Sequence, residues 1–206
     1  MSATHQAPAI VLASASPRRS ELLASIGVKF EVLPAAIDET RRDDEQPAAY
    51  VTRIACEKAR RGAELAGSHG RLVLGADTTV VIGSRTLGKP EDRDEALEML
   101  AAIAGRTHQV MTAVALTDGD RVEYRVSETS VTMRTIARSE AEAYWSTGEP
   151  GDKAGSYAVQ GVGGIFVERL AGSYSGVVGL PLFETADLLA AFGYRVLECP
   201  GRTAND

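Results

Sequence analysis

Apolar and polar residues along the chain fall into stretches of two kinds, which predict strands and helices in turn. Continuous or alternating apolar residues predict strands at residues 9–13, 28–33, 72–76, 79–82, 108–117, 122–135, 165–170 and 194–198. Apolar spacings of three and four predict helices at residues 16–26, 47–66, 93–104 and 182–192, and a capping box at 139–142 starts another that ends at Gly148. The strands at 108–117 and 122–135 form a long central β-hairpin, and residues 83–88 predict a turn. This order predicts an α/β fold with a mixed, twisted sheet flanked by helices.

The composition narrows the classes of function. The 206 residues suffice for a single domain, with two lobes around a cleft as an alternative, and the net charge is −6. An acidic chain does not suit nucleic acid, so a basic site must be local, as for a small phosphorylated ligand. Two cysteines and three scattered histidines exclude a disulfide framework and a zinc site and fit a reducing cytosol. No apolar run has transmembrane length, and residues 1–8 do not have the features of a secretory signal.

The helix predicted at residues 16–26 begins with an unexpected pair of arginines. Ser16 suits the N-cap and Pro17 suits the first turn. Arg18 and Arg19, however, lie where the helix dipole favours acids. Guanidinium groups beside unpaired amides gain partners when an anion binds there. The start of this helix therefore predicts a phosphate site, and the competing interpretation is a pair of exposed surface arginines.

Asp77 is the carboxylate that stands out most. It interrupts the most apolar stretch, residues 72–82, and a charge there costs free energy unless something binds it. The interruption predicts two strands separated at Asp77 and Thr78. Because two β-branched residues, Thr78 and Thr79, follow it, which is poor turn chemistry, we favour a functional aspartate over an ordinary turn aspartate.

Four other charged residues are further candidates for a functional site. Asp38 and Glu39 come just after a strand, where the sites of α/β proteins gather. Together with Asp77 they offer oxygen ligands to Mg²⁺, and a solvated acidic loop is the competing interpretation. Lys58 lies between small residues of the long helix, and Lys89 follows a tight turn.

Two glycine-rich stretches are similar to nucleotide-binding loops but fail at one residue each. Residues 83–90 approach a Walker A loop, but Pro90 stands where Ser or Thr must reach Mg²⁺. Residues 161–164 approach a dinucleotide fingerprint, but Phe166 stands where the third glycine belongs. We interpret these glycines as places where the backbone passes close to a ligand or another strand. Gln160, beside the second stretch, carries a donor and an acceptor that can read the edge of a base.

Six segments, taken together and in order, make the chain resemble the Maf family of nucleoside triphosphate pyrophosphatases. They are Ser14-Ala15-Ser16-Pro17-Arg18-Arg19, Glu57-Lys58-Ala59, Gly75-Ala76-Asp77-Thr78, Gly88-Lys89-Pro90, Asp152-Lys153-Ala154-Gly155 with Gln160-Gly161, and Gly172-Ser173-Tyr174 to Gly179-Leu180-Pro181-Leu182. The resemblance extends over residues 9–198. It implies one Maf-like domain across residues 1–206, with a fold similar to those of Maf and inosine triphosphatase proteins.

The resemblance also implies an activity. It implies hydrolysis of dTTP and UTP to the monophosphate and pyrophosphate by water attack at the α-phosphorus, with a divalent metal, Mg²⁺ or alternatively Mn²⁺. It further implies a cytoplasmic location and, commonly, a homodimer. The roles it implies are proton acceptor for Asp77; base specificity for Arg18, Thr78 and Gln160; phosphate binding for Ser14, Ser16, Arg19, Lys58 and Lys89; and metal binding for Asp77 and Glu39, with Asp38 as the alternative to Glu39.

Two other functions use the same residues differently. One is a pyrophosphatase for modified nucleotides, a house-cleaning role set by contacts to the base. The other is a nucleotide-binding regulator of cell division, which would need the phosphate site but not Asp77. Pyrophosphate release and its dependence on the base distinguish all three.

Overall fold

The computed structural model describes residues 10–67 and 70–197 and builds them around one seven-stranded sheet. The strands are β1 (Ile10–Leu12), β2 (Phe30–Val32), β3 (Val73–Ile82), β4 (Arg85–Leu87), β5 (Thr107–Thr117), β6 (Val122–Met133) and β7 (Val167–Ala171). Their order is β2-β1-β3-β5-β6-β7, and β4 also pairs with β3. Because β1 runs parallel to β2 and β3 while the other pairs are antiparallel, the sheet is mixed, as predicted.

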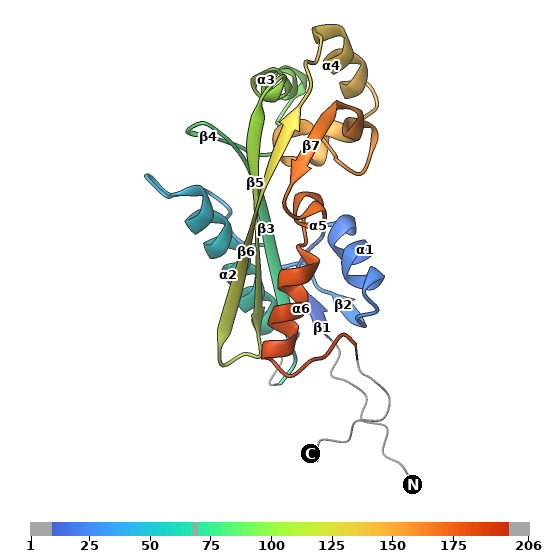
Figure 1. Ribbon diagram of the computed structural model, residues 1–206. Coiled ribbons are helices and arrows are strands. Elements are labelled where there is room, and N and C mark those ends of the chain that lie inside the picture. The colour runs from blue at the N-terminus through green and yellow to red at the C-terminus, as the bar shows by residue number, and fades with distance from the viewer. Residues whose placement is uncertain (1–9, 68–69, 198–206) are drawn as a thin grey trace.

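Helices cover both faces of this sheet (Figure 1). The helices are α1 (Pro17–Ser25), α2 (Pro47–Ala66), α3 (Arg93–Ile103), α4 (Arg138–Trp145), α5 (Tyr174–Val178) and α6 (Leu182–Ala191), with 3₁₀ helices η1 (Glu149–Asp152), η2 (Ala154–Ser156) and η3 (Val162–Phe166). The long helix α2 packs along β3 and β5 on one face, and α5 and α6 cover β5 and β6 on the other. The α/β class and the long β5–β6 hairpin are thus confirmed.

The helix boundaries follow local sequence chemistry. Gly27 and Gly67 take left-handed φ angles of +76° and +58° just after α1 and α2, a conformation that glycine adopts without strain. The Asp92 carboxylate caps α3 by accepting the Glu95 amide at 2.9 Å. These predicted ends are therefore confirmed to within a residue or two.

The prediction of two strands separated at Asp77 is wrong. Strand β3 continues from Val73 to Ile82, and Asp77 pairs with Ala113 of β5 in an unbroken register. The β-branched residues Thr78 and Thr79 favour the extended chain, and β5 pairs with β3 on both sides of the acid. The charge is accommodated inside a strand because it has an ionic partner, described below.

The connections also differ from the predictions. The turn expected at residues 83–88 is a hairpin, because Gly83 turns the chain with φ +58° and β4 then pairs back on β3. The segment just before α6, for which no helix was predicted, contains the short helix α5, capped by the Ser173 side chain, which accepts the Gly176 amide at 3.0 Å.

The capping box expected at residues 139–142 is shifted. The N-cap of α4 is Ala137, two residues before the expected Ser139, and the Glu140 carboxylate accepts the Ala137 amide at 2.9 Å. The strand expected at 194–198 is wrong for residues 194–197, because the Tyr194 amide bonds back to the Leu189 carbonyl at 2.8 Å and ends α6 instead. Residue 198 lies outside the described residues.

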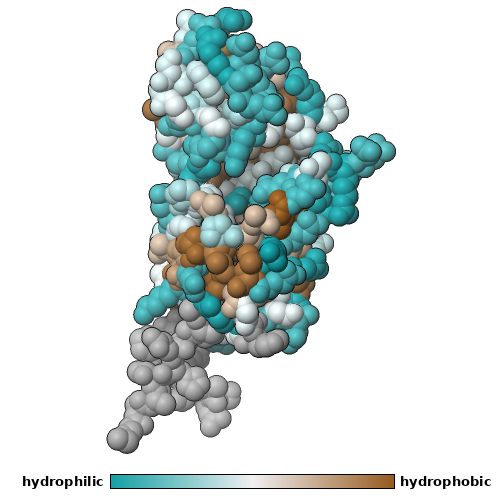
Figure 2. All heavy atoms as spheres, turned by 180° about the vertical axis from the view of Figure 1, so that it is seen from behind, coloured by the Kyte–Doolittle hydropathy of each residue, from teal (hydrophilic) through white to brown (hydrophobic). Residues whose placement is uncertain are grey.

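Two main hydrophobic cores lie toward opposite ends of the sheet. One packs β1, α1 and α6 against the lower half of β3 and β5, and its largest members include Ile10, Leu23, Leu74 and Leu188. The other packs α3 and α4 against the upper half, with Leu100, Ile103, Tyr144 and Phe166. Figure 2 shows a largely hydrophilic surface from behind, with hydrophobic side chains gathered in its lower half. Within the described ranges, no helix combines the length and the apolar character that crossing a bilayer requires.

Candidate active site

A gap in the pairing of β3 creates the cleft between the two cores. On one edge, β3 pairs with β1 only at Val73 and Leu74, and it meets β4 again only at Val80. Among the described residues, no strand covers the edge between these two points. The gap therefore opens the middle of β3 to a cavity of about 600 Å³.

All the residues predicted for the site meet at this cleft. Its lining includes Ser14, Ser16, Arg18, Arg19, Glu39, Lys58, Asp77, Thr78, Lys89 and Gln160. They come from the β1–α1 turn, the first turn of α1, the loop after β2, helix α2, strand β3, the loop after β4 and the loop before η3. The volume lies within the range of about 300–1,000 Å³ that is typical of small-molecule sites.

The buried centre of the cleft is an ionic cluster of two acids and one lysine. The Lys58 ammonium lies 2.9 Å from Asp77 Oδ1 and 3.0 Å from Glu39 Oε1. Lys58 and Asp77 have side chains only 9% and 8% exposed, whereas the Glu39 side chain is 52% exposed. The two carboxylates thus converge on a single cation position at the cleft floor.

Gly75 explains how α2 brings Lys58 to Asp77. A Cβ atom on Gly75 would lie 2.4 Å from the Ala55 carbonyl oxygen and 2.6 Å from the Ala59 amide nitrogen. Only glycine therefore lets the backbone of α2 approach β3 this closely. Asp77 lies two residues further along β3 and hence on the same face of the sheet, opposite Lys58.

Burial raises the pKa of Asp77 above its usual value. The neighbouring Lys58 and Arg19 charges oppose this shift, and the Glu39 carboxylate adds to it. An ionised carboxylate with a raised pKa is a better proton acceptor than an exposed aspartate. The environment is thus suited to acid–base chemistry.

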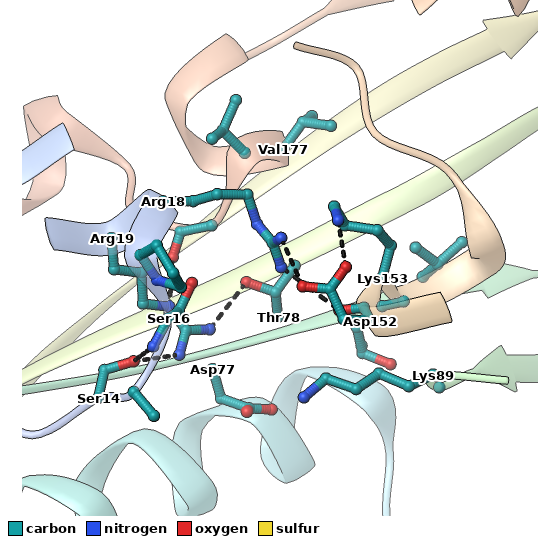
Figure 3. A pocket seen from close by; sticks show the side chains of 18 of the residues that line it. Ser14, Ser16, Arg18, Arg19, Asp77, Thr78, Lys89, Asp152, Lys153 and Val177 are labelled. Carbon is teal, nitrogen blue, oxygen red and sulfur yellow. Dashed lines mark hydrogen bonds and ion pairs between the residues drawn. The ribbon is translucent and has the colours of Figure 1, made fainter. Parts of the chain in front are cut away.

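The second arginine at the start of α1, Arg19, is built into the cleft wall. Its guanidinium donates to the Gly179 carbonyl at 2.8 Å, to Ser14 Oγ at 3.2 Å and to Thr78 Oγ1 at 3.4 Å. Figure 3 shows Arg19 between the Ser14 turn and Thr78. These contacts use three of the five N–H donors that a guanidinium carries, which leaves donors for an anion.

Ser14 and Ser16 shape the turn that leads into α1. Ser14 Oγ accepts the Ser16 amide at 3.2 Å as well as the Arg19 contact, and Ser14 is buried. Ser16 is the N-cap residue by position, but its side chain makes no capping bond. The first-turn amides of a helix have no partner within the helix, so this end of α1 offers donors to the cleft.

Arg18 reaches across the cleft to the opposite wall. It forms an ion pair with Asp152 of η1, with Nη1 3.0 Å from Oδ2. Lys153 contacts the other oxygen of the same carboxylate (Figure 3). The pair joins residues 134 positions apart in the chain and bridges the lower and upper walls.

The remaining basic side chain of the predicted set, Lys89, reaches along the floor toward Asp77 (Figure 3). The Gly155 amide donates to the Gly88 carbonyl at 3.0 Å, which holds the loop that precedes Lys89 against the Asp152 loop. Altogether the lining carries five basic side chains (Arg18, Arg19, Lys58, Lys89 and Lys153) and three acidic ones (Glu39, Asp77 and Asp152). The cleft is therefore locally positive although the chain is acidic overall.

The two neighbouring acids at residues 38 and 39 point to different places. Glu39 lines the cleft, whereas the Asp38 carboxylate accepts the Thr40 amide at 2.9 Å and lines a separate surface notch. The Tyr50 hydroxyl donates to the Glu39 carbonyl at 3.0 Å and holds the loop in this arrangement. Geometry thus favours Glu39 over Asp38 as a residue of the site.

Sequence reasoning gave no role to several cleft residues. Asp152 and Lys153 belong to a segment that carries the family resemblance, but nothing in the sequence pairs them with Arg18. Tyr50 follows the start of a helix, where an aromatic residue gives no signal of a site. Finding these contacts requires the fold, because each joins elements distant in the chain.

The family model described as Maf-like protein matches residues 9–192. The chain belongs to the Maf family. The dTTP/UTP pyrophosphatase of Saccharophagus degradans is 55% identical over 185 residues, which are 89% of this chain and 88% of that protein. The dTTP/UTP pyrophosphatase of Pseudoalteromonas atlantica is 54% identical over 183 residues, which are 88% of this chain and 95% of that protein.

A more distant likeness is found among solved structures. The nucleoside-triphosphatase / dITP/XTP pyrophosphatase of Mycobacterium abscessus aligns with a TM-score of 0.38 and 20% identity, over 62% of this chain and 73% of that chain. A likeness at this level says nothing about the site. The Maf family match and the curated relatives confirm the resemblance drawn from the six segments.

Proposed function

We propose that this Maf protein hydrolyses dTTP and UTP to the monophosphate and pyrophosphate in the cleft beside β3. The observation that carries the proposal is Asp77, a carboxylate of raised pKa buried at the floor of a cleft with an excess of basic side chains. The names of the relatives, which cover most of this chain, support the substrate. A triphosphate tail matches the locally positive lining, and the size of the cleft matches a nucleotide.

The basic residues would hold the triphosphate and receive the charge of the leaving group. Ser14, Ser16, Arg19 and the first turn of α1 offer N–H and O–H donors on one wall. On the floor, Lys58 contacts Asp77 and Lys89 reaches toward it. Positive charge fixed where pyrophosphate develops its negative charge stabilises the transition state more than the ground state.

Asp77 would act on the attacking water. In this step the water oxygen forms a bond to the α-phosphorus, and the bond from that phosphorus to the oxygen bridging to the β-phosphate breaks. The water proton passes to the Asp77 carboxylate, and pyrophosphate leaves with the electron pair of the broken bond. Arg18, Thr78 and Gln160, at the cleft wall, would contact the base.

The donor set also fits a divalent cation. Asp77 and Glu39 already converge on one cation position, which the Lys58 ammonium holds. No group of three or more His, Cys, Asp or Glu side chains arranged for a metal occurs in the described ranges. Mg²⁺ is commonly bound by one or two carboxylates together with substrate phosphates, and Asp77 and Glu39 supply two such carboxylates. When bound, the cation would neutralise phosphate charge and acidify water.

The experiment compares Asp77→Asn with Asp38→Asn. Asparagine at position 77 keeps the size but cannot accept a proton, so turnover of dTTP should fall by about 10²-fold or more. Binding of a nonhydrolysable dTTP analogue, measured by calorimetry, should be retained. Asp38→Asn is the matched control, because its side chain makes only a local bond to Thr40 and asparagine can keep it. Near-normal turnover in Asp77→Asn would remove the role given to Asp77.

A further inference from the structure

The loop that brings Gln160 to the cleft is held from behind by two side chains. The Tyr144 hydroxyl, at the end of α4, accepts the Ala158 amide at 3.1 Å. The Glu149 carboxylate, at the start of η1, accepts the Val162 amide at 2.9 Å and the Gly163 amide at 2.9 Å. Tyr144 and Glu149 thus anchor the loop at three amides. One lies two residues before Gln160, and the others lie two and three residues after it.

The two anchors are also joined to each other. The Tyr144 hydroxyl donates to Glu149 Oε1 at 2.6 Å. Tyr144 is only 3% exposed and packs edge-on against Phe166, with ring centroids 5.2 Å apart. The Glu149 carboxylate thus receives three hydrogen bonds, and bonds to an ionised acceptor are among the stronger ones in proteins.

Two glycines of the loop are shaped to these anchors. A Cβ atom on Gly161 would lie 2.2 Å from Glu149 Oε2, and one on Gly163 would lie 2.4 Å from the Tyr144 hydroxyl. Gly161 and Gly163, which in sequence belong to the approximate dinucleotide fingerprint, are therefore explained by close contact with side chains of the protein itself, and Gly164 by the Val159 carbonyl oxygen, 2.7 Å from where its Cβ would lie. Loop and anchors form one closely fitted unit.

The ionisation of the anchors agrees with this arrangement. Burial works against the charge on Glu149, but the hydrogen bonds from Tyr144, Gly163 and Val162 outweigh it, so its pKa is lowered. Burial, and then the bond to Glu149, raises the pKa of Tyr144. At neutral pH the pair is thus a carboxylate acceptor and a neutral hydroxyl, as the bonding pattern requires.

We propose that Tyr144 and Glu149 are positioning residues that set the place of Gln160 and thereby the choice of base. Neither belongs to the residues that line the cleft, so they act on the nucleotide through the loop. The inference rests on the proposed function for the identity of the substrate. Misplacing one base-reading side chain should lower discrimination between bases, while the phosphate contacts from the β1–α1 turn, α1, α2 and the loop after β4 stay in place.

The test uses Glu149→Gln and Tyr144→Phe, with Glu142→Gln as the matched control. In the wild type, the Tyr144 hydroxyl and two loop amides all donate to the Glu149 carboxylate. Glutamine replaces one of the two acceptor oxygens by an NH₂ group, which is itself a donor, so at least one loop amide loses its acceptor. Phenylalanine removes the hydroxyl and leaves the ring packing against Phe166. Glu142, on the same helix as Tyr144, forms only solvent-exposed ion pairs with Arg93 and Arg138.

Two readouts separate positioning from general damage. Binding of nonhydrolysable UTP and CTP analogues gives the preference for the base without requiring turnover, and competition by inorganic tripolyphosphate reports on the phosphate contacts alone. Glu149→Gln should reduce the UTP-over-CTP preference by about tenfold, with a smaller loss in Tyr144→Phe, while tripolyphosphate competition stays within about twofold of wild type. Glu142→Gln should match the wild type in both.

Three results would overturn the inference. The first is an unchanged base preference in folded Glu149→Gln and Tyr144→Phe. The second is an equal loss of affinity for both analogues and for tripolyphosphate, which means a structural role only. The third is a wild type that binds both analogues equally, because no preference then exists to be set. A wild type that prefers the UTP analogue but releases no pyrophosphate would overturn the proposed function alone.

Discussion

Replacing Lys58 by methionine removes the ammonium group that contacts both Asp77 and Glu39. Methionine keeps the length and the apolar stem of the side chain, so the change is mainly one of charge. Removing one partner of a buried ion pair costs about 3–5 kcal/mol, because the other charge stays buried. We expect the lower end at pH 8, about 3 kcal/mol, because Arg19 remains near Asp77 and Glu39 is half exposed.

The cost should depend on pH, because Asp77 can escape its charge by binding a proton. The folded-state pKa of Asp77 is already raised, so the folded chain binds more protons than the unfolded chain above pH 3.9, and stability falls as pH rises through that window. Without Lys58, the pH range over which stability falls extends to higher pH. The loss of unfolding free energy that comes from ionising Asp77 cannot exceed about 1.36 kcal/mol for each pH unit above about 3.9. At pH 5 this limit is about 1.5 kcal/mol.

Urea denaturation at pH 5 and pH 8, followed by the fluorescence of Trp145, measures this difference. Lys89→Met is the matched control, because Lys89 is an exposed lysine of the same cleft and its loss should change the free energy of unfolding by about 0.5 kcal/mol or less. An equal deficit for Lys58→Met at both pH values, or a deficit at pH 8 no larger than that of the control, would refute the account of a buried ionic cluster.

Two further predictions concern how the fold supports the site. Gly75→Ala should destabilise the protein by about 1–3 kcal/mol and reduce turnover, because the new Cβ pushes α2 and Lys58 away from β3. Gly88→Ala is the control and should unfold like wild type in urea, because a Cβ at position 88 has no neighbour within 4 Å. A stable, fully active Gly75→Ala protein would show that the close approach of α2 is not required. Asp92→Ala should lower the free energy of unfolding by about 1 kcal/mol through loss of the α3 cap, with turnover unchanged, and no loss in calorimetric melting would contradict that cap.

The sequence singled out Asp77 through the mismatch between its charge and its apolar surroundings. An aspartate inside an apolar stretch needs a partner, and Asp77 has two basic neighbours. The same mismatch gave the wrong local structure, because the strand was expected to break at the charge. Strand pairing is a tertiary property, and the partner that makes the charge tolerable, Lys58, comes from a helix 19 residues earlier.

Contacts between distant segments were beyond sequence reasoning. Helix ends could be predicted because Gly27, Gly67 and Asp92 act on their own neighbours in the chain. The Arg18–Asp152 pair joins walls 134 residues apart, and the anchors of the Gln160 loop depend on how α4 meets η1. The periodicity of apolar residues carries no information about contacts between distant segments. A glycine in the sequence indicates only that another part of the chain comes close to it, and not which part.

The measurement that tests the central claim most directly is product analysis after incubating the protein with Mg²⁺ and each of dTTP, UTP, CTP, GTP, ATP and 7-methyl-GTP. The account predicts equal amounts of monophosphate and pyrophosphate, formed fastest from dTTP and UTP. A diphosphate with inorganic phosphate would contradict attack at the α-phosphorus, and a preference for another base would contradict the specificity. Folded protein that releases no pyrophosphate from any of the six would contradict the proposed activity itself.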